Sequence, residues 1–287
     1  MQLSPAPLTI ASADGYALKA LYYSKPESNS ILVIGSATGV PQGYYRRFAE
    51  YALDTGFDVI TFDYRGIGQS APTTLKGFDI DYRDWARFDL QAVVDYAVSL
   101  GKQLAFVGHS YGGQALGLLS TPHVFRAATF FGTGAGWQGW MPKMERLKVS
   151  LMWNVVGPVL TRRHGFLRWS KLGMGEDLPL GVYRQWKRWC QFPEFFFEDP
   201  DYAYLIEQFA KVSMPIRALT SVDDKWASPR SRDAFMKYYT GSNVSNIDIH
   251  PRDVGMKSIG HMGYFRAAAK ALWEQELALL NLTVLND

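Results

Sequence analysis

The chain has 287 residues, of which 47% are hydrophobic and 20% are charged, and its formal net charge is +3. This balance is typical of a folded globular protein and argues against a disordered chain or a nucleic-acid-binding protein. The length allows one large α/β domain or two small ones, and we expect one core with an insertion.

The chain shows no targeting or membrane-spanning pattern. No apolar run reaches about 18 residues, and the first five residues (MQLSP) lack the basic start and apolar stretch of a signal peptide. We therefore expect no transmembrane helix and, by default, a cytoplasmic location. The single cysteine, Cys190, cannot form an internal disulfide and has no cysteine partner for a metal site, which agrees with a reducing compartment.

The first half of the chain predicts a hairpin followed by alternating strands and helices. Asp14-Gly15 is a strong hairpin turn signal, and residues 16–23 are rich in β-prone side chains. From Ile31, short apolar runs alternate with helical segments at residues 31–34, 44–53, 59–62, 85–100 and 104–107, with a further strand at 127–131. Such alternation indicates βαβ units and a mostly parallel sheet.

Residues 137–208 interrupt this alternation. They contain six of the nine tryptophans and many basic side chains, but no clear strand. We interpret them as a helical cap inserted into a core formed by residues 1–136 and 209–287. We expect apolar cap residues to line a dry pocket, namely Trp153, Val155, Val156, Leu160 and Phe166. Peripheral membrane contact through this aromatic and basic segment is an alternative that we favour less.

The alternation resumes after the insertion. Residues 215–220 predict a strand, and Ser228-Pro229 predicts the start of a helix, because serine suits the N-cap and proline the first helical position. Residues 247–249 predict the last strand, and residues 264–280 predict a terminal helix.

The most informative motif is Gly108-His109-Ser110-Tyr111-Gly112, between a predicted buried strand and a predicted helix. This is the context of a Gly-x-Ser-x-Gly nucleophile elbow, in which the serine lies on a sharp turn. A serine hydroxyl is a weak nucleophile, so it needs a base and donors that stabilise the oxyanion. The motif therefore indicates Ser110 as a candidate nucleophile.

Two later loops offer the base and the acid. His261 lies in a glycine-flanked loop after the last predicted strand, at the carboxyl edge where α/β sheets place their sites. Asp223 and Asp224 follow the strand at 215–220, at the same edge, and one of them would orient the histidine. Two adjacent carboxylates would repel in one pocket, so we expect the other to face solvent or cap a neighbouring backbone.

These motifs, together with Asp63-Tyr64-Arg65-Gly66-Ile67-Gly68-Gln69-Ser70, resemble the α/β-hydrolase fold superfamily over residues 8–135 and 213–282. The resemblance implies an α/β-hydrolase fold: a mostly parallel sheet with an antiparallel N-terminal edge, helices on both faces and an inserted helical cap. The order serine, aspartate, histidine matches the triad of this superfamily. Aligned on the strand end, the family acid falls on Asp224 rather than Asp223.

The resemblance also implies an oxyanion hole. One donor is the backbone N–H of Tyr111, and the second lies in the loop Ser36–Gly39, where Gly35-Ser36 replaces the usual His-Gly pair. We assign the second donor to Ala37. If the loop aligns with the family one residue differently, the donor is a neighbour of Ala37. The loop containing Asp63 and Arg65 is expected to shape the site from below without taking part in the chemistry, held by an ion pair or backbone hydrogen bonds.

The leading hypothesis is a serine hydrolase that cleaves an ester or thioester of a small, largely apolar acyl group, with no cofactor or metal. A serine at the elbow argues against the dehalogenase and epoxide-hydrolase branches, which need a carboxylate nucleophile. An acyltransferase and a carbon–carbon bond hydrolase would use the same triad and remain alternatives. A catalytically silent ligand-binding homologue is the non-enzymatic alternative, and the sequence leaves the substrate and the oligomeric state open.

Overall fold

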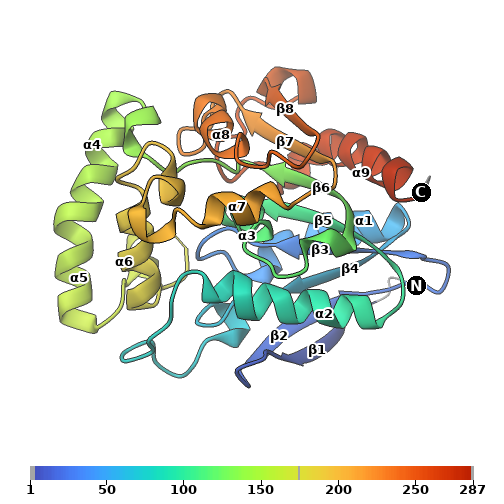
Figure 1. Cartoon of the computed structure of the whole chain (residues 1–287), viewed down its shortest axis with the longest axis horizontal. Coiled ribbons are helices and arrows are strands. Elements are labelled where there is room, and N and C mark those ends of the chain that lie inside the picture. Colours follow the sequence, from blue (N-terminus) through green and yellow to red (C-terminus); the bar gives the residue numbers. More distant parts are fainter. Residues whose placement is uncertain (1–3, 174, 286–287) are drawn as a thin grey trace.

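The computed structural model describes residues 4–173 and 175–285. Within them, eight strands form one sheet in the order β1-β2-β4-β3-β5-β6-β7-β8 (Figure 1). Strand β1 (Ala6–Ala11) pairs antiparallel with β2 (Ala17–Tyr23), which pairs antiparallel with β4, and all later neighbours are parallel. The predicted mostly parallel sheet with an antiparallel N-terminal edge is confirmed.

The six remaining strands coincide with the predicted apolar runs to within three residues at either end. They are β3 (Ser30–Gly35), β4 (Phe57–Phe62), β5 (Gln103–His109), β6 (Phe125–Phe131), β7 (Ile216–Ser221) and β8 (Val244–Ile249). The central strands are apolar almost throughout because both faces of a parallel sheet are covered. In β3, for example, Ile31 and Val33 enter one hydrophobic core while Leu32 and Ile34 enter the other.

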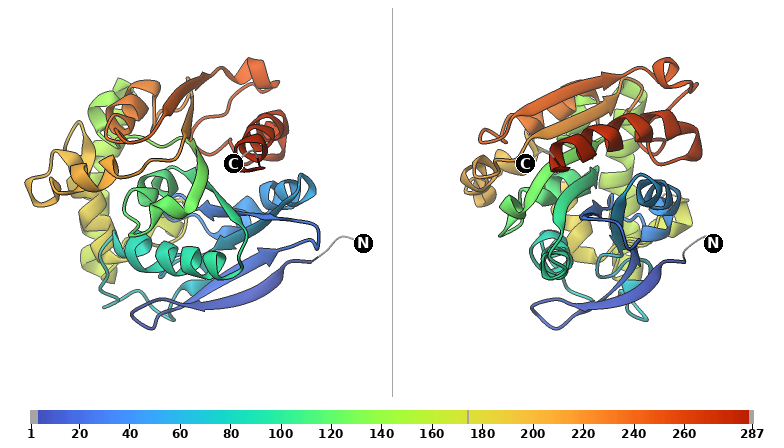
Figure 2. Two further views of the ribbon diagram at one scale, coloured as in Figure 1. Left: turned by 45° about the vertical axis from the view of Figure 1, so that its right-hand side comes forward. Right: turned by 90° about the vertical axis from the view of Figure 1, so that its right-hand side faces the viewer.

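Helices cover both faces of the sheet (Figure 2). Helices α1 (Arg46–Asp54) and α9 (Lys270–Leu285) pack on one face. Helices α2 (Gln91–Ser99), α3 (Tyr111–Leu116) and α8 (Pro229–Met236) pack on the other. The Ser228 hydroxyl accepts the N–H of Ser231, as expected of the N-cap of α8.

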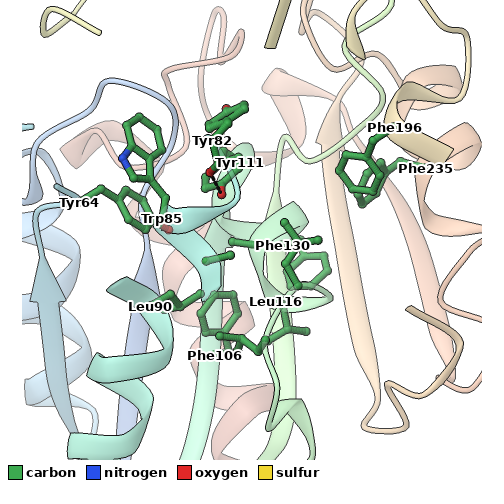
Figure 3. Close-up of a cluster of buried hydrophobic side chains, with 14 of the residues drawn as sticks. Tyr64, Tyr82, Trp85, Leu90, Phe106, Tyr111, Leu116, Phe130, Phe196 and Phe235 are labelled. Atoms are coloured by element: carbon green, nitrogen blue, oxygen red, sulfur yellow. Dashed lines mark hydrogen bonds between the residues drawn. The ribbon is translucent and has the colours of Figure 1, made fainter. Parts of the chain in front are cut away.

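An aromatic cluster lies beside the elbow on the face that carries α3 (Figure 3). The ring of Tyr111 stacks on Tyr82 with centroids 4.3 Å apart, and Tyr64 stacks on Trp85 at 5.0 Å. The Tyr111 hydroxyl donates to the Tyr82 carbonyl. These contacts fix the first turn of α3, which follows Ser110 directly.

The loop from Asp63 to Ser70 has a structural role, as expected. The buried Arg65 guanidinium pairs with Asp89 and Asp14, and this contact holds the pKa of Asp14 well below its usual range. Asp63 does not pair with Arg65 but accepts hydrogen bonds from the backbone and side chain of Gln42.

The terminal helix begins later than predicted. Helix α9 starts at Lys270 rather than at Tyr264, after a short 3₁₀ turn at Ala267–Ala269. Tyr264 and Phe265 are buried, and the Tyr264 hydroxyl reaches the backbone N–H of Ser221 across the end of the sheet. A helix through Tyr264 would have to give up this contact, so the chain stays irregular until it has passed the sheet edge.

Residues 137–208 form helices beside the carboxyl ends of the parallel strands (Figure 1). They contain α4 (Lys143–Leu151), α5 (Gly157–His164) and α6 (Leu180–Trp189), and α7 (Leu205–Ala210) crosses the predicted boundary at residue 208. A π-helical turn, Met152–Val156, joins α4 to α5. The division of the chain into core and cap remains a prediction.

Candidate active site

Ser110 lies on a sharp turn between β5 and α3. Its φ of +51° is in a region that non-glycine residues rarely adopt, as expected of a strained elbow. Two glycines make the turn possible: a Cβ at Gly108 would overlap the backbone nitrogen of Gly113, and one at Gly112 would overlap the carbonyl oxygen of Gly35. The second contact presses the elbow against the end of β3.

The structure brings Ser110, His261 and Asp224 together. His261 Nε2 lies 3.0 Å from Ser110 Oγ, and His261 Nδ1 lies 2.9 Å from Asp224 Oδ2. In a neutral imidazole, this arrangement places the proton on Nδ1 facing the carboxylate and leaves Nε2 to accept the serine proton. The Asp224 side chain is fully buried, the His261 side chain is 20% exposed and Ser110 is partly exposed, so the line is accessible at its serine end.

Asp224 is held in one orientation by its other contacts. Its Oδ1 accepts the backbone N–H groups of Trp226 and Ala227, each at 2.9 Å, and its Oδ2 also accepts the Tyr264 hydroxyl at 3.0 Å. Burial of an ionisable group requires such partners. Sequence reasoning found Asp224 but missed Tyr264, which comes from a segment 40 residues later.

Asp223 has different partners from its neighbour. It accepts the Ser258 hydroxyl at 2.6 Å and the backbone N–H groups of Gly260 at 2.9 Å and Ile259 at 3.1 Å. Burial alone would raise the pKa of the Asp223 carboxyl, but these and neighbouring hydrogen bonds hold it below its ordinary value. Asp223 therefore ties the turn before His261 to the end of β7, in line with the expectation that the second aspartate caps a backbone.

A chain of hydrogen bonds crosses the site behind the serine. The backbone N–H of Ala37 donates to the Tyr45 hydroxyl at 2.9 Å, the hydroxyl lies 2.9 Å from His109 Nδ1, and His109 Nε2 lies 2.9 Å from the carbonyl oxygen of His261. Burial lowers the pKa of His109 to about 3, so the ring is neutral at physiological pH. With the tyrosine donating to Nδ1, the Nε2 proton is directed at the His261 carbonyl.

This chain argues against Ala37 as an oxyanion donor, because its N–H is already used. The N–H groups of Ser36 and Tyr111 have no hydrogen-bond partner within the residues that the structure describes. Gly35 packs directly on Gly112, which brings the following N–H of Ser36 beside the elbow. The geometry therefore disfavours Ala37 and makes the N–H of Ser36, one residue earlier, the candidate for the second donor.

A group of indole rings continues outward from His261. The ring centroids of Trp226 and His261 are 6.5 Å apart, and those of Trp186 and Trp226 are 6.2 Å apart. Trp169 stacks on Trp186 at 5.1 Å, and Trp153 meets it edge-on at 5.1 Å. We call Trp153, Trp169, Trp186 and Trp226 the tryptophan wall.

One of the residues predicted to line a pocket faces solvent instead. Trp153 is buried within the tryptophan wall, but Val155 is 53% exposed to solvent. The two residues are two positions apart in a helical segment and so point in nearly opposite directions. Trp226 was not expected at the site, although its position two residues after Asp224 is a signal that could have found it.

Other reactive groups do not form a second centre in the described ranges. Residues 4–173 and 175–285 hold no group of three histidine, cysteine, aspartate or glutamate side chains suited to a metal ion. They also contain no helix whose length and apolar character would let it cross a membrane. Cys190 is buried, and burial raises the pKa of its thiol, which makes it a poor nucleophile.

Most of the chain is similar to a known family. The model of a family described as the alpha/beta hydrolase family matches residues 32–270 of the chain. The chain belongs to the alpha/beta hydrolase family. The match includes the elbow, the Asp223-Asp224 loop and the His261 loop, so all three parts of the site lie within the hydrolase region.

Solved structures of other alpha/beta hydrolases are similar along nearly the whole chain. A soluble variant of monoglyceride lipase from Saccharomyces cerevisiae, in complex with a substrate analogue, has a TM-score of 0.69 at 14% identity, covering 98% of this chain and 96% of that chain. An esterase from Pyrococcus furiosus has a TM-score of 0.65 at 12% identity, covering 98% and 91%. Such low identities establish the shared fold alone. No curated protein matches the sequence.

Proposed function

We propose that this alpha/beta hydrolase is a serine hydrolase that cleaves an ester or thioester of a small, largely apolar acyl group. The observation that carries the proposal is the hydrogen-bonded line from Asp224 through His261 to Ser110, with separations of 2.9 and 3.0 Å. Membership of the family supports hydrolysis in general. The strained turn at Ser110 and the accessible end of the line support a nucleophilic role for this serine.

The first half of the reaction forms an acyl-enzyme. His261 Nε2 accepts the proton of the Ser110 hydroxyl while Ser110 Oγ attacks the carbonyl carbon of the substrate. The resulting imidazolium keeps its Nδ1–H directed at the Asp224 carboxylate, which stabilises the positive charge. The imidazolium then protonates the leaving alcohol or thiol as the bond between the carbonyl carbon and the leaving group breaks.

The oxyanion of the tetrahedral intermediate needs donors that are free before the substrate arrives. We propose the backbone N–H groups of Tyr111 and Ser36 for this role. Both lack a partner within the described part of the chain, and the contact between Gly35 and Gly112 holds the two donor segments together.

The second half of the reaction returns the enzyme. Neutral His261 removes a proton from a water molecule, whose oxygen attacks the acyl carbon of the Ser110 ester. Collapse of the second tetrahedral intermediate breaks the bond between the acyl carbon and Ser110 Oγ, and His261 returns the proton to that oxygen. The products are the free carboxylic acid and the starting serine.

We further propose that residues 137–208 are the cap that shapes the acyl pocket of a core formed by residues 1–136 and 209–287. The cap contributes three members of the tryptophan wall, and Trp226 of the core carries the wall to His261. A wall of aromatic rings beside the base favours an apolar acyl group over a charged one.

An ester panel tests this proposal. Methyl esters of acids from acetic to decanoic are hydrolysed in a pH-stat by wild type, Trp226→Ala and Ser110→Ala. We expect activity to rise from acetate to a short or medium apolar acyl group and to be lost in Ser110→Ala. Trp226→Ala should lower kcat/KM for the preferred ester about tenfold, because it removes apolar surface from the pocket.

Trp140→Ala is the matched control, since it also removes a tryptophan but the Trp140 ring packs on Trp137 and under the Arg230 guanidinium, outside the tryptophan wall. It should leave the preference along the panel unchanged. Equal rates along the whole panel in wild type would refute the apolar acyl pocket.

A further inference from the structure

The outer face of the α4–α5 segment carries an unusual row of exposed apolar side chains. Between 53% and 66% of the surface of each is exposed, and they are Met144, Leu147, Leu151, Val155 and Val159. Their spacing of three and then four residues places them along one side of a helix. Single exposed apolar residues are ordinary, but a contiguous row marks an interaction surface. We call these five residues the apolar ridge.

The segment is one continuous helical rod. Met152, directly after α4, and Gly157, directly after the π-helical turn, both keep right-handed helical dihedrals, so the chain does not break between α4 and α5. At about 1.5 Å per residue, the ridge from Met144 to Val159 is about 22 Å long. The π-helical turn has a period above four residues, which keeps Val155 and Val159 in line with Leu151.

The opposite side of the rod already has its packing partner. The ring centroids of Trp153 and of Tyr183 in α6 are 5.6 Å apart, and a Cβ at Gly157 would overlap the Tyr183 hydroxyl. Figure 1 shows α6 between this rod and the sheet, with α4 and α5 at the outer edge of the molecule. The apolar ridge is therefore not needed to attach the rod to the protein.

Basic side chains accompany the ridge. Residues 143–164 contain one acidic residue, Glu145, and five exposed basic residues, which are Lys143, Arg146, Lys148, Arg162 and Arg163. Five positive charges less one negative give +4, whereas the whole chain has a net charge of only +3. The rest of the molecule is thus slightly acidic, and the positive charge is concentrated at the two ends of the ridge.

We propose that the apolar ridge and its flanking basic residues dock this protein on an anionic lipid surface. A helix with an exposed apolar face and Lys or Arg beside it lies in the plane of a membrane interface, with apolar side chains among the acyl chains and cations at the headgroups. The inference rests on exposure and charge, and it stands whether or not Ser110 is a nucleophile.

The positive charge favours lipid over a second copy of the chain as the partner that covers the apolar ridge. Two ridges packed face to face would bring two segments of +4 together, and this repulsion opposes a dimer through the same surface. An anionic lipid surface covers the apolar ridge and neutralises the basic residues at the same time.

A vesicle flotation assay tests the proposal. The full chain is mixed with vesicles of phosphatidylcholine alone or with about one third phosphatidylglycerol. We expect wild type to bind the anionic vesicles at least about tenfold more tightly than the neutral ones. The variant Leu147→Ser/Leu151→Ser/Val159→Ser should bind the anionic vesicles at least about tenfold more weakly than wild type.

Val98→Ser/Leu282→Ser is the matched control, because it removes two exposed apolar residues outside the ridge. It should bind like wild type, and thermal melts should show that all variants fold. The proposal is overturned if wild type does not bind anionic vesicles, or if wild type and the ridge variant bind them equally. The proposal is also overturned if wild type is a dimer that does not bind vesicles while the ridge variant is a monomer. That result would assign the ridge to contact with a second copy of the chain.

Discussion

Asp223 and Asp224 are neighbours in the chain but hold different partners. Asp224 accepts a hydrogen bond from the ring N–H of His261. Asp223 accepts hydrogen bonds from a hydroxyl and from backbone N–H groups in the turn that precedes His261. One carboxylate therefore faces the imidazole and the other positions the loop that carries it.

Replacing each aspartate by asparagine should separate these roles. Asp224→Asn should lower kcat about 10⁴-fold, because the amide favours the tautomer of His261 that cannot accept the serine proton. Asp223→Asn should keep this tautomer, lower kcat about tenfold and reduce the free energy of unfolding by about 1–2 kcal/mol. Steady-state kinetics with the preferred ester and urea unfolding measure the two effects. A larger loss of kcat in Asp223→Asn would reverse the assignment.

The burial of His109 predicts that the stability of the fold depends on pH. Its pKa is about 3 in the folded protein and near 6.5 when unfolded, because burial disfavours the charged ring. Between these values the unfolded chain binds more protons, so the stability contributed by His109 is complete above about pH 6.5 and is lost as the pH falls toward 3.

His109→Gln removes this titration. We expect its free energy of unfolding to fall less steeply than that of wild type between pH 6.5 and 4.5, as measured by urea denaturation. His250→Gln is the control, since His250 is exposed, and it should follow wild type. Parallel curves for His109→Gln and wild type would show that His109 is not held neutral by burial.

The sequence was sufficient to indicate the candidate site residues that lie in or beside a local motif. Ser110, Tyr111, Asp224 and His261 each follow a predicted strand, and the carboxyl edge collects such positions. Tyr45 and Tyr264 could not be placed in this way, because their partners are distant in the chain and depend on how helices and loops pack. The proposed change of oxyanion donor from Ala37 to Ser36 has the same cause, because the Tyr45 hydroxyl accepts the Ala37 N–H.

Among the elements, α3 and β3 approach each other unusually closely. The backbone of Gly112 lies against the carbonyl group of Gly35, which leaves no room for a side chain. This contact holds the elbow and the loop that begins at Ser36 in a fixed relation.

Gly112→Ala should therefore be destabilising. We expect the free energy of unfolding to fall by about 2–3 kcal/mol, because the added methyl group must separate two backbones. Gly43→Ala, where a Cβ meets nothing within 4 Å, should change it by less than about 0.5 kcal/mol. Urea unfolding of both variants measures the difference, and equal stability would mean that α3 and β3 are further apart than described.

Hydrophobic periodicity predicted the elements well where strands alternate with helices, because burial on both faces imposes continuous apolar runs. It failed at the start of α9. Residues 264–269 carry an apolar pattern like that of a helix. Tyr264 is buried because its hydroxyl bonds Ser221 and Asp224, however, and not because it lies on the inner face of a helix. Tertiary contacts overrode the local pattern.

At the scale of the whole molecule, one sheet with two covered faces places every part of the site at its carboxyl edge. The fold class, the antiparallel edge and the family were predictable from strand order and motifs. The arrangement of residues 137–208 was not, because no motif states which side of each helix in this segment faces inward. Only the structure separates the inward Trp153 from the outward Val155.

The proposed activity depends above all on Ser110 being an activated nucleophile. Treatment of the folded protein with a fluorophosphonate probe, followed by peptide mass spectrometry, tests it most directly. We predict one adduct, on Ser110, with no adduct in Ser110→Ala and labelling at least about a hundredfold slower in His261→Ala. A folded wild-type protein that remains unlabelled, or a Ser110→Ala variant that labels as fast as wild type, would rule out this role for Ser110.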